Sequence, residues 1–267
     1  MKKNSFIRLL SASAVSLLLA GCAVKEMPSD ITLDELEVRM SQAMDPAGDY
    51  RKALSYFQRQ NIEEDGFFGK KHQLVEVRFQ RPDKFKFSFF AKNRIVTELL
   101  SVGGKAWMID YQEGTVTELT GEALEKFKIM LALGHPDTDY DRLFASVQLS
   151  LVEEDDHVFY KLVCQPKLTG ANPIVIYVDQ TSSLPRRIAL KINTPQGTVE
   201  STSEIEQYQA FNTINVPAVT RVSEGSRDYL TRVVGYQLNA PFNAEEFQLP
   251  VFDRVLLEVQ KYKESNN

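Results

Sequence analysis

Residues 81–89 read RPDKFKFSF, and large apolar side chains alternate there with polar ones. Phe85, Phe87 and Phe89 fall on one side of an extended chain, whereas the lysines and the serine between them fall on the other. Such alternation predicts a strand in an antiparallel sheet that has one apolar face. Pro82 lies where this strand would begin, which is one of the few strand positions that tolerate proline.

The same period of two recurs on both sides of this stretch. Residues 73–79 (QLVEVRF) place alternate apolar side chains on one face, and residues 102–119 predict a hairpin that turns near 112–114. Many strands joined by short turns, without alternating helices, predict one antiparallel sheet that is strongly curved or rolled up. The further strands are expected over residues 148–153, 158–165, 174–179, 185–193, 198–210, 218–224 and 228–238.

One helical segment interrupts the series of strands. Apolar residues recur at helical spacing over residues 120–133, and Ile129 and Leu133 lie outside the main apolar stripe, so this helix is apolar on more than one face. A second short helix is expected over residues 138–146, and an amphipathic helix is expected over 32–44. The main stripe of the central helix comprises Ala123, Leu124, Phe127, Met130 and Leu131.

Residues 1–21 have the features of an export signal. Basic residues precede an apolar segment that is shorter than the roughly 20 residues a membrane-spanning helix needs. Residues 19–22 (LAGC) match the lipobox of bacterial lipoproteins, which implies that Cys22 carries palmitate or similar acyl chains after cleavage. An ordinary signal peptide followed by a chance cysteine is the alternative. The expected division is a lipoprotein signal peptide over 1–21, a lipidated tether over 22–30 and a single domain over 31–267.

The lipobox match also predicts a location. Two or more acyl chains on Cys22 would anchor the protein firmly to a membrane. Ala23 follows the cysteine, whereas an Asp at that position retains lipoproteins in the inner membrane of many double-membraned bacteria. We therefore expect the protein to be anchored in the outer membrane and to face the periplasm.

The charge balance argues against a nucleic-acid partner. The chain has 31 Lys+Arg and 36 Asp+Glu, and residues 1–21 hold three of the basic residues and none of the acidic ones. The remaining chain has 28 basic and 36 acidic residues, a net charge of −8. Nucleic-acid-binding domains carry a basic footprint, which this chain lacks. It also offers no polybasic patch for anionic lipids, so membrane attachment is expected to come from the lipid on Cys22.

The sequence lacks the motifs of common enzymes. It contains no G-x-S-x-G elbow, Walker loop or dinucleotide fingerprint. His72, His135 and His157 have no metal-ligand spacing, and each is expected to be a solvated loop residue. Cys164 alternates with apolar residues and is expected to be buried rather than catalytic. We therefore expect no enzymatic activity, metal or cofactor. The sequence does not show whether two distant carboxylates pair in space for glycoside hydrolysis, so that alternative is left open.

The stretch at 81–89 is followed by ELLSVGGKAWMIDYQEGTVTEL at 98–119, and in this order the two segments resemble the LolA/LolB lipoprotein-carrier superfamily. The segment NAPFNAEEFQLP at 239–250 resembles the closing segment of that family. The resemblance implies a mainly β fold with a helical lid, in which a curved antiparallel sheet forms an unclosed β-barrel. Helices would cover its mouth, and the cavity would hold acyl chains. The chain departs from the soluble carrier because Cys22 is expected to be lipidated, as in the receptor of the family.

The resemblance also assigns candidate residues. Arg81 and Phe85 match an R-P-x-x-F segment that in the family lies near the lid and governs its opening and lipid transfer. The alternative is a surface charge at a strand end and a plain core aromatic. Trp107 matches the tryptophan of the family's hairpin and is expected in the core. Which strand side chains point inward depends on the strand register, which the sequence does not give. The candidate ligand-binding residues are Arg81, Phe85, Phe87, Phe89, Trp107, Phe127, Met130 and Leu131.

Two functions are consistent with these observations. The first is a membrane-anchored periplasmic lipoprotein that binds acyl chains or lipoproteins in an apolar cavity, in lipid or lipoprotein transport. The alternative is a non-catalytic envelope interaction or sensor protein that reuses the same fold, binds an envelope protein and has a filled centre without ligand. A dry pocket of several hundred cubic ångströms would favour the first. A hydrolase ranks behind both.

Overall fold

The computed structural model describes residues 25–66, 69–194 and 197–252. The first half of the chain forms the strands β1 (Lys25–Pro28), β2 (Ser55–Gly66), β3 (Gly69–Gln80), β4 (Lys84–Ala91), β5 (Arg94–Val102), β6 (Lys105–Asp110) and β7 (Thr115–Leu119). The second half forms β8 (Ser146–Glu154), β9 (His157–Gln165), β10 (Ile174–Asp179), β11 (Pro185–Thr194), β12 (Gly197–Phe211), β13 (Ile214–Glu224) and β14 (Arg227–Leu238). The helices are α1 (Leu33–Met44), α2 (Asp49–Lys52), α3 (Gly121–Leu133), α4 (Tyr140–Leu143) and the short 3-10 helix η1 (Ala244–Phe247).

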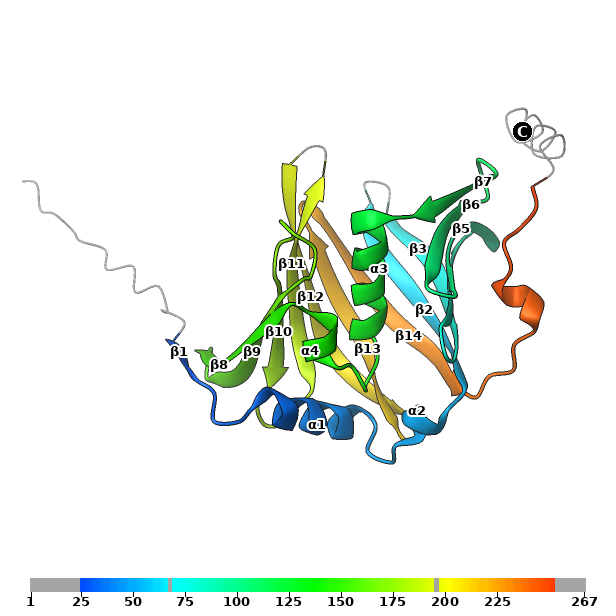
Figure 1. Cartoon of the computed structure of the whole chain (residues 1–267). Helices are drawn as coiled ribbons and strands as arrows, with labels where there is room; N and C mark the ends of the chain where they lie inside the picture. Colours follow the sequence, from blue (N-terminus) through cyan, green and yellow to red (C-terminus); the bar gives the residue numbers. More distant parts are fainter. Residues whose placement is uncertain (1–24, 67–68, 195–196, 253–267) are drawn as a thin grey trace, which may run out of the picture.

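All of these strands join one sheet of 14 strands, in the order β1-β8-β9-β10-β11-β12-β13-β14-β2-β3-β4-β5-β6-β7. Figure 1 shows this sheet curving around α3, with α1 lying across one end. The two edge strands, β1 and β7, stand at opposite ends of the order, so the sheet does not close on itself. The expected fold class, a curved antiparallel sheet with helices over its open side, is confirmed. No helix in the described ranges is long and apolar enough to cross a membrane.

The phenylalanine stretch of the sequence forms β4, and its register fixes the concave face. Phe85 and Phe87 lie opposite Phe79 and Val77 of β3, so the large side chains of the two strands share one surface. Phe85, Val77 and Phe79 are each less than 8% exposed. This surface forms one of the hydrophobic clusters inside the curved sheet.

The N-terminal elements differ from the expectation in one respect. Residues 25–28 lie within the segment expected to be a tether, but they form β1 and pair with residues 150–153 of β8. The following helix α1 starts as predicted, because Thr32 and Glu35 form a reciprocal capping box. Residues 1–24, which include the expected signal peptide and Cys22, lie outside the described residues.

The C-terminal segment covers part of the convex face. In Figure 1 it runs along the outside of β5 and β6. Phe247 of η1 is 5% exposed and forms a cluster with Leu100 and Ile109, against which Trp107 packs. The carboxylate of Glu246 in η1 forms an ion pair with Arg78 of β3, with 3.2 Å between Oε2 and Nε. Because strand side chains alternate between faces, Trp107 therefore lies on the side of the sheet away from α3.

Candidate ligand-binding cavity

The central helix α3 crosses the concave side of the sheet (Figure 1), and its two apolar faces meet different surroundings. On one face, the ring of Phe127 packs edge-to-face against Phe85, with ring centroids 6.0 Å apart. Leu124 and Leu131 pack against the same cluster, and Phe127 is only 5% exposed. This side of α3 is therefore occupied by packed side chains.

The other face of α3 lines a cavity of about 590 Å³. Ile129, Met130 and Leu133 form its helical wall. The volume falls within the range of about 300–1,000 Å³ that is typical of small-molecule sites. Met130 is 49% exposed, so the cavity communicates with the solvent. The opposite wall is formed by neighbouring strands from β10 to β14. Its apolar side chains include Ile174, Ile176, Ile188, Leu190, Ile205 and Pro217.

The cavity has a polar end and an apolar end. Near the start of α3 its lining includes Glu122, Glu125 and Lys126, and β12 contributes Ser201 and Ser203. Figure 1 shows that α3 begins at the same end of the sheet as the hairpin between β11 and β12. The lining at the opposite end is apolar or aromatic and includes Met44, Leu133, Tyr140 and Pro217. The space can therefore hold a molecule with an apolar chain at one end and a polar group at the other.

The candidate residues from the sequence lie on different surfaces. Met130 lines the cavity. Trp107 lies in the cluster on the convex face, and Arg81 lies beside the connection that follows α3. The remaining candidates belong to the packed cluster on the other face of α3, and they are Phe85, Phe87, Phe89, Phe127 and Leu131.

Sequence reasoning alone does not identify the strand side of the cavity. In β10 every residue of the run IVIYV is apolar or aromatic, so the pattern favours neither face. The register with β9 and β11 buries Ile176 and Val178 on the inner side. Tyr177 points to the outer side, where the guanidinium of Arg187 lies 3.8 Å from the centre of its ring. Only the pairing with neighbouring strands distinguishes the two faces.

Arg81 lies where α2, β2 and the α3–α4 connection meet. Its Nε donates to the carbonyl of Ala53 at 3.0 Å, and its Nη2 donates to the carbonyl of Tyr50 at 3.3 Å. The same Nη2 lies 3.5 Å from the carboxylate of Asp137, which follows α3. The guanidinium also covers the rings of Tyr50 and Phe79. Arg81 therefore connects the end of the lid helix to the rest of the domain.

His135 follows α3 directly and is packed among aromatic rings. Its ring meets Phe79 and Tyr50 edge-to-face, with centroids 4.9 and 5.6 Å away. Burial lowers the pKa of His135 to about 4, because the imidazolium would lose its hydration there. Neither Nε2 of His135 nor Oη of Tyr50 has a hydrogen-bond partner among the described residues. The expectation that His135 is a solvated loop residue is wrong, since the turn after α3 folds inward.

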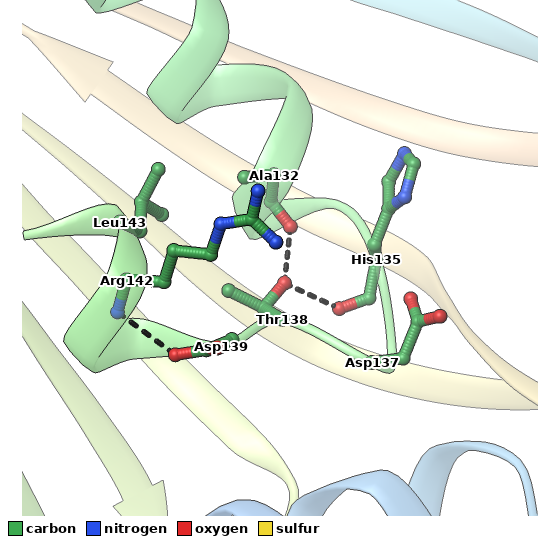
Figure 2. Close-up of a pocket in the computed structure, with 7 residues that line it drawn as sticks. All are labelled: Ala132, His135, Asp137, Thr138, Asp139, Arg142 and Leu143. Carbon is green, nitrogen blue, oxygen red and sulfur yellow. Dashed lines mark hydrogen bonds between the residues drawn. The ribbon is translucent and has the colours of Figure 1, made fainter. Parts of the chain in front are cut away.

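A smaller hollow of about 320 Å³ lies in the α3–α4 connection (Figure 2). Figure 2 shows the Thr138 hydroxyl donating to the carbonyls of Ala132 and His135. The carboxylate of Asp139 accepts from the backbone N–H of Arg142 at 2.8 Å and caps α4. These polar groups shape the turn, and the His135 ring turns away from them (Figure 2). The larger cavity is therefore the better candidate for a ligand.

The described residues do not gather into a metal site. Within the described ranges, no group of three or more His, Cys, Asp or Glu side chains could hold a metal ion. Cys164 is fully buried, and burial raises the pKa of its thiol to about 12. A thiol that is neutral and inaccessible is a poor nucleophile.

No family model and no curated protein matches the sequence of this chain. Among solved structures, a DUF1329 family protein from Desulfovibrio piger superposes with a TM-score of 0.56 at 14% identity, over 80% of this chain and 95% of that chain. A LolA superfamily protein from Nitrosomonas europaea has a TM-score of 0.56 at 13% identity, over 82% of this chain and 98% of that chain.

A domain from Vibrio parahaemolyticus, described as an outer membrane lipoprotein-sorting protein domain, has a TM-score of 0.53 at 10% identity. That match covers 83% of this chain and 97% of the domain. At these identities the likeness concerns the backbone arrangement and not individual side chains. The resemblance expected from the sequence is confirmed at this level, and the chain has the fold of LolA superfamily proteins.

Proposed function

We propose that this protein is a membrane-anchored envelope lipoprotein that holds an acyl chain of a lipid or lipoprotein in the cavity beneath α3. The observation that carries the proposal is the apolar cavity of about 590 Å³ inside an unclosed sheet. The shared fold with a LolA superfamily protein and with a lipoprotein-sorting domain supports a role in lipid or lipoprotein transport. The filled centre that the interaction-protein alternative requires is not present on this side of α3.

Burial of a lipid tail is sufficient to drive such binding. Each methylene moved from water to an apolar site contributes about 0.8 kcal/mol. About ten methylenes would contribute about 8 kcal/mol, which exceeds the lower estimates, about 4 kcal/mol, for the lost freedom of the ligand. The walls need no reactive group for this task. We therefore propose a binding protein rather than an enzyme.

The proposed anchor would place a defined edge of the molecule at the membrane. Cys22 precedes Lys25, the first residue of β1, by three residues. Three extended residues span about 10 Å. An acylated Cys22 would therefore hold the β1–β8 edge of the sheet close to the bilayer, and the absence of Asp after it favours the outer membrane.

Binding of an acyl ligand can be tested with two matched variants on β12. Ser203 lines the cavity, whereas its neighbour Thr202 points to the other side of the strand. A Ser203→Phe variant should fill the cavity and weaken binding of a fluorescent palmitoyl probe at least tenfold, and Thr202→Phe should bind as the parent does. If the parent binds no probe, and native mass spectrometry of membrane-purified protein shows no copurifying lipid, the proposal is wrong.

Anchoring is tested separately by cell fractionation. A Cys22→Ser variant should move from the membrane fraction to the soluble periplasm. If the variant stays with the membrane, the lipid on Cys22 is not its anchor.

A further inference from the structure

We infer that the cavity accepts a single acyl chain whose polar head carries an ammonium group, as in a zwitterionic lysophospholipid. This inference rests on the proposed function, because it specifies the ligand of the same cavity. A protein with such a ligand differs from one that encloses all the acyl chains of a lipoprotein anchor.

The volume of the cavity limits the number of chains. A cavity of about 150 Å³ holds one benzene molecule, which corresponds to about 25 Å³ per carbon atom. The cavity of about 590 Å³ therefore has room for one palmitoyl chain with part of a small head group. Three palmitoyl chains would need about 1,200 Å³ by the same measure. On the opposite face of α3, Phe127 and Phe85 pack against each other, so side chains occupy that position.

The polarity of the walls orients the chain. Along α3 the lining changes from charged at Glu122 and Lys126 to apolar at Ile129 and Leu133. Positions separated by three or four residues share one face of a helix, so this is a continuous stripe. Along β12 the lining changes from serine at positions 201 and 203 to Ile205. In Figure 1, α3 and β12 both run from the same end of the sheet toward the other. The lining of both therefore changes in the same direction, so the tail would point toward Tyr140 and the head toward the start of α3.

The polar end favours a cationic group on the ligand. The two lysines at this end already form ion pairs. The Nζ of Lys126 lies 2.5 Å from Oε1 of Glu122, and the Nζ of Lys191 lies 3.1 Å from Oε1 of Glu200. Glu224 also lines this end. Its cross-strand neighbour Arg227 donates instead to Glu64 at 2.9 Å.

Among the described residues Glu224 has no ion-pair partner within 4.0 Å. A ligand ammonium would supply one, whereas an anionic head would meet a carboxylate that the charge of Arg227 offsets only at longer range. The side chain that would distinguish head groups is therefore Glu224.

The test uses the full chain with Cys22→Ser, because this form should be obtained without detergent, which would compete for the cavity. The protein is incubated with an equimolar mixture of four probes and examined by native mass spectrometry. The probes are palmitoyl-lysophosphatidylethanolamine, palmitoyl-lysophosphatidylglycerol, dipalmitoyl-phosphatidylethanolamine and a tripalmitoyl lipopeptide. We expect one lysolipid per protein, at least tenfold more occupancy by lysolipids than by the other two probes, and about threefold preference for ethanolamine over glycerol.

A charge-neutral variant tests the role of the carboxylate. Glu224→Gln should remove the preference for ethanolamine without loss of lysolipid binding. The control is Glu206→Gln, which neutralises an exposed carboxylate of β12 that pairs with Arg221 and does not line the cavity.

The inference is overturned if the diacyl or triacyl probe binds as well as the lysolipids, or if the preference for ethanolamine is absent or survives Glu224→Gln. The first result leaves acyl binding intact. Failure of all four probes to bind would overturn the proposed function as well.

Discussion

Replacing His135 with phenylalanine should remove an acid-sensitive part of the stability of this protein. The imidazole lies at the end of the lid helix among the rings of Phe79 and Tyr50, and burial lowers its pKa from 6.5 to about 4. The folded state therefore favours the neutral imidazole, whereas the unfolded chain becomes protonated near pH 6.5. The stabilisation is fully present above pH 6.5 and is lost as the pH falls toward 4.

The size of the effect follows from the two pKa values. A shift from 6.5 to about 4 corresponds to a total of about 3 kcal/mol, since one pKa unit is about 1.4 kcal/mol. Between pH 7 and pH 5 the linkage relation gives a loss of about 2 kcal/mol from this residue alone. Carboxylates also titrate in this range, but they are the same in both proteins, so the difference between parent and variant isolates His135.

Urea denaturation at pH 7 and pH 5 measures this difference. The free energy of unfolding of the parent should fall by about 2 kcal/mol more than that of His135→Phe. His72→Phe is the control, because the His72 side chain is 63% exposed and lies outside the aromatic cluster. If the parent and His135→Phe lose the same stability between the two pH values, the imidazole is not buried in its neutral form, and the packing described for the end of α3 is wrong.

Three further predictions concern the packing of α3, the ion pair between β4 and β5, and the thiol in β9. Phe127→Ala should lower the free energy of unfolding by about 3–4 kcal/mol in urea denaturation, because it removes a buried ring that fixes α3 to the sheet. The control Lys128→Ala, on the exposed surface of the same helix, should change this free energy by less than about 0.5 kcal/mol. Glu98→Ala should lower the free energy of unfolding by about 3 kcal/mol in the same assay, because Glu98 is 1% exposed and its loss leaves the ammonium of Lys86 unpaired. An unchanged urea midpoint of unfolding would count against this ion pair. Cys164 should resist alkylation by iodoacetamide in the native protein and react after unfolding, and rapid native labelling would show that its strand is open.

The sheet could be predicted because its signal is local. Alternation at Phe85, Phe87 and Phe89 fixes a strand face without knowledge of its neighbours, and turn residues separate the later strands. The capping box at Thr32 likewise fixed the start of α1 to within one residue. The four-residue helix α2 gave no periodic signal, because one helical turn is too short to show a period.

The cavity could be predicted only in part. The sequence showed that α3 is apolar on more than one face, and the structure uses one face for packing at Phe127 and the other for the cavity at Ile129 and Leu133. Which face is filled depends on the curvature of the sheet and on side chains distant in sequence. The inward position of Ile176 depends on strand register. The burial of His135 depends on a turn that folds toward β2 and β3, which composition does not reveal.

The position of a bound acyl chain can be mapped by photocrosslinking. A palmitoyl ligand with a photoreactive diazirine at the end of its tail is crosslinked to the Cys22→Ser protein, and the modified residues are mapped by mass spectrometry. We expect crosslinks at Leu133, Tyr140 and Ile176, which surround the apolar end of the cavity. Crosslinks confined to Phe87 and Phe89, on the other side of α3, or the absence of any crosslink would contradict this expectation.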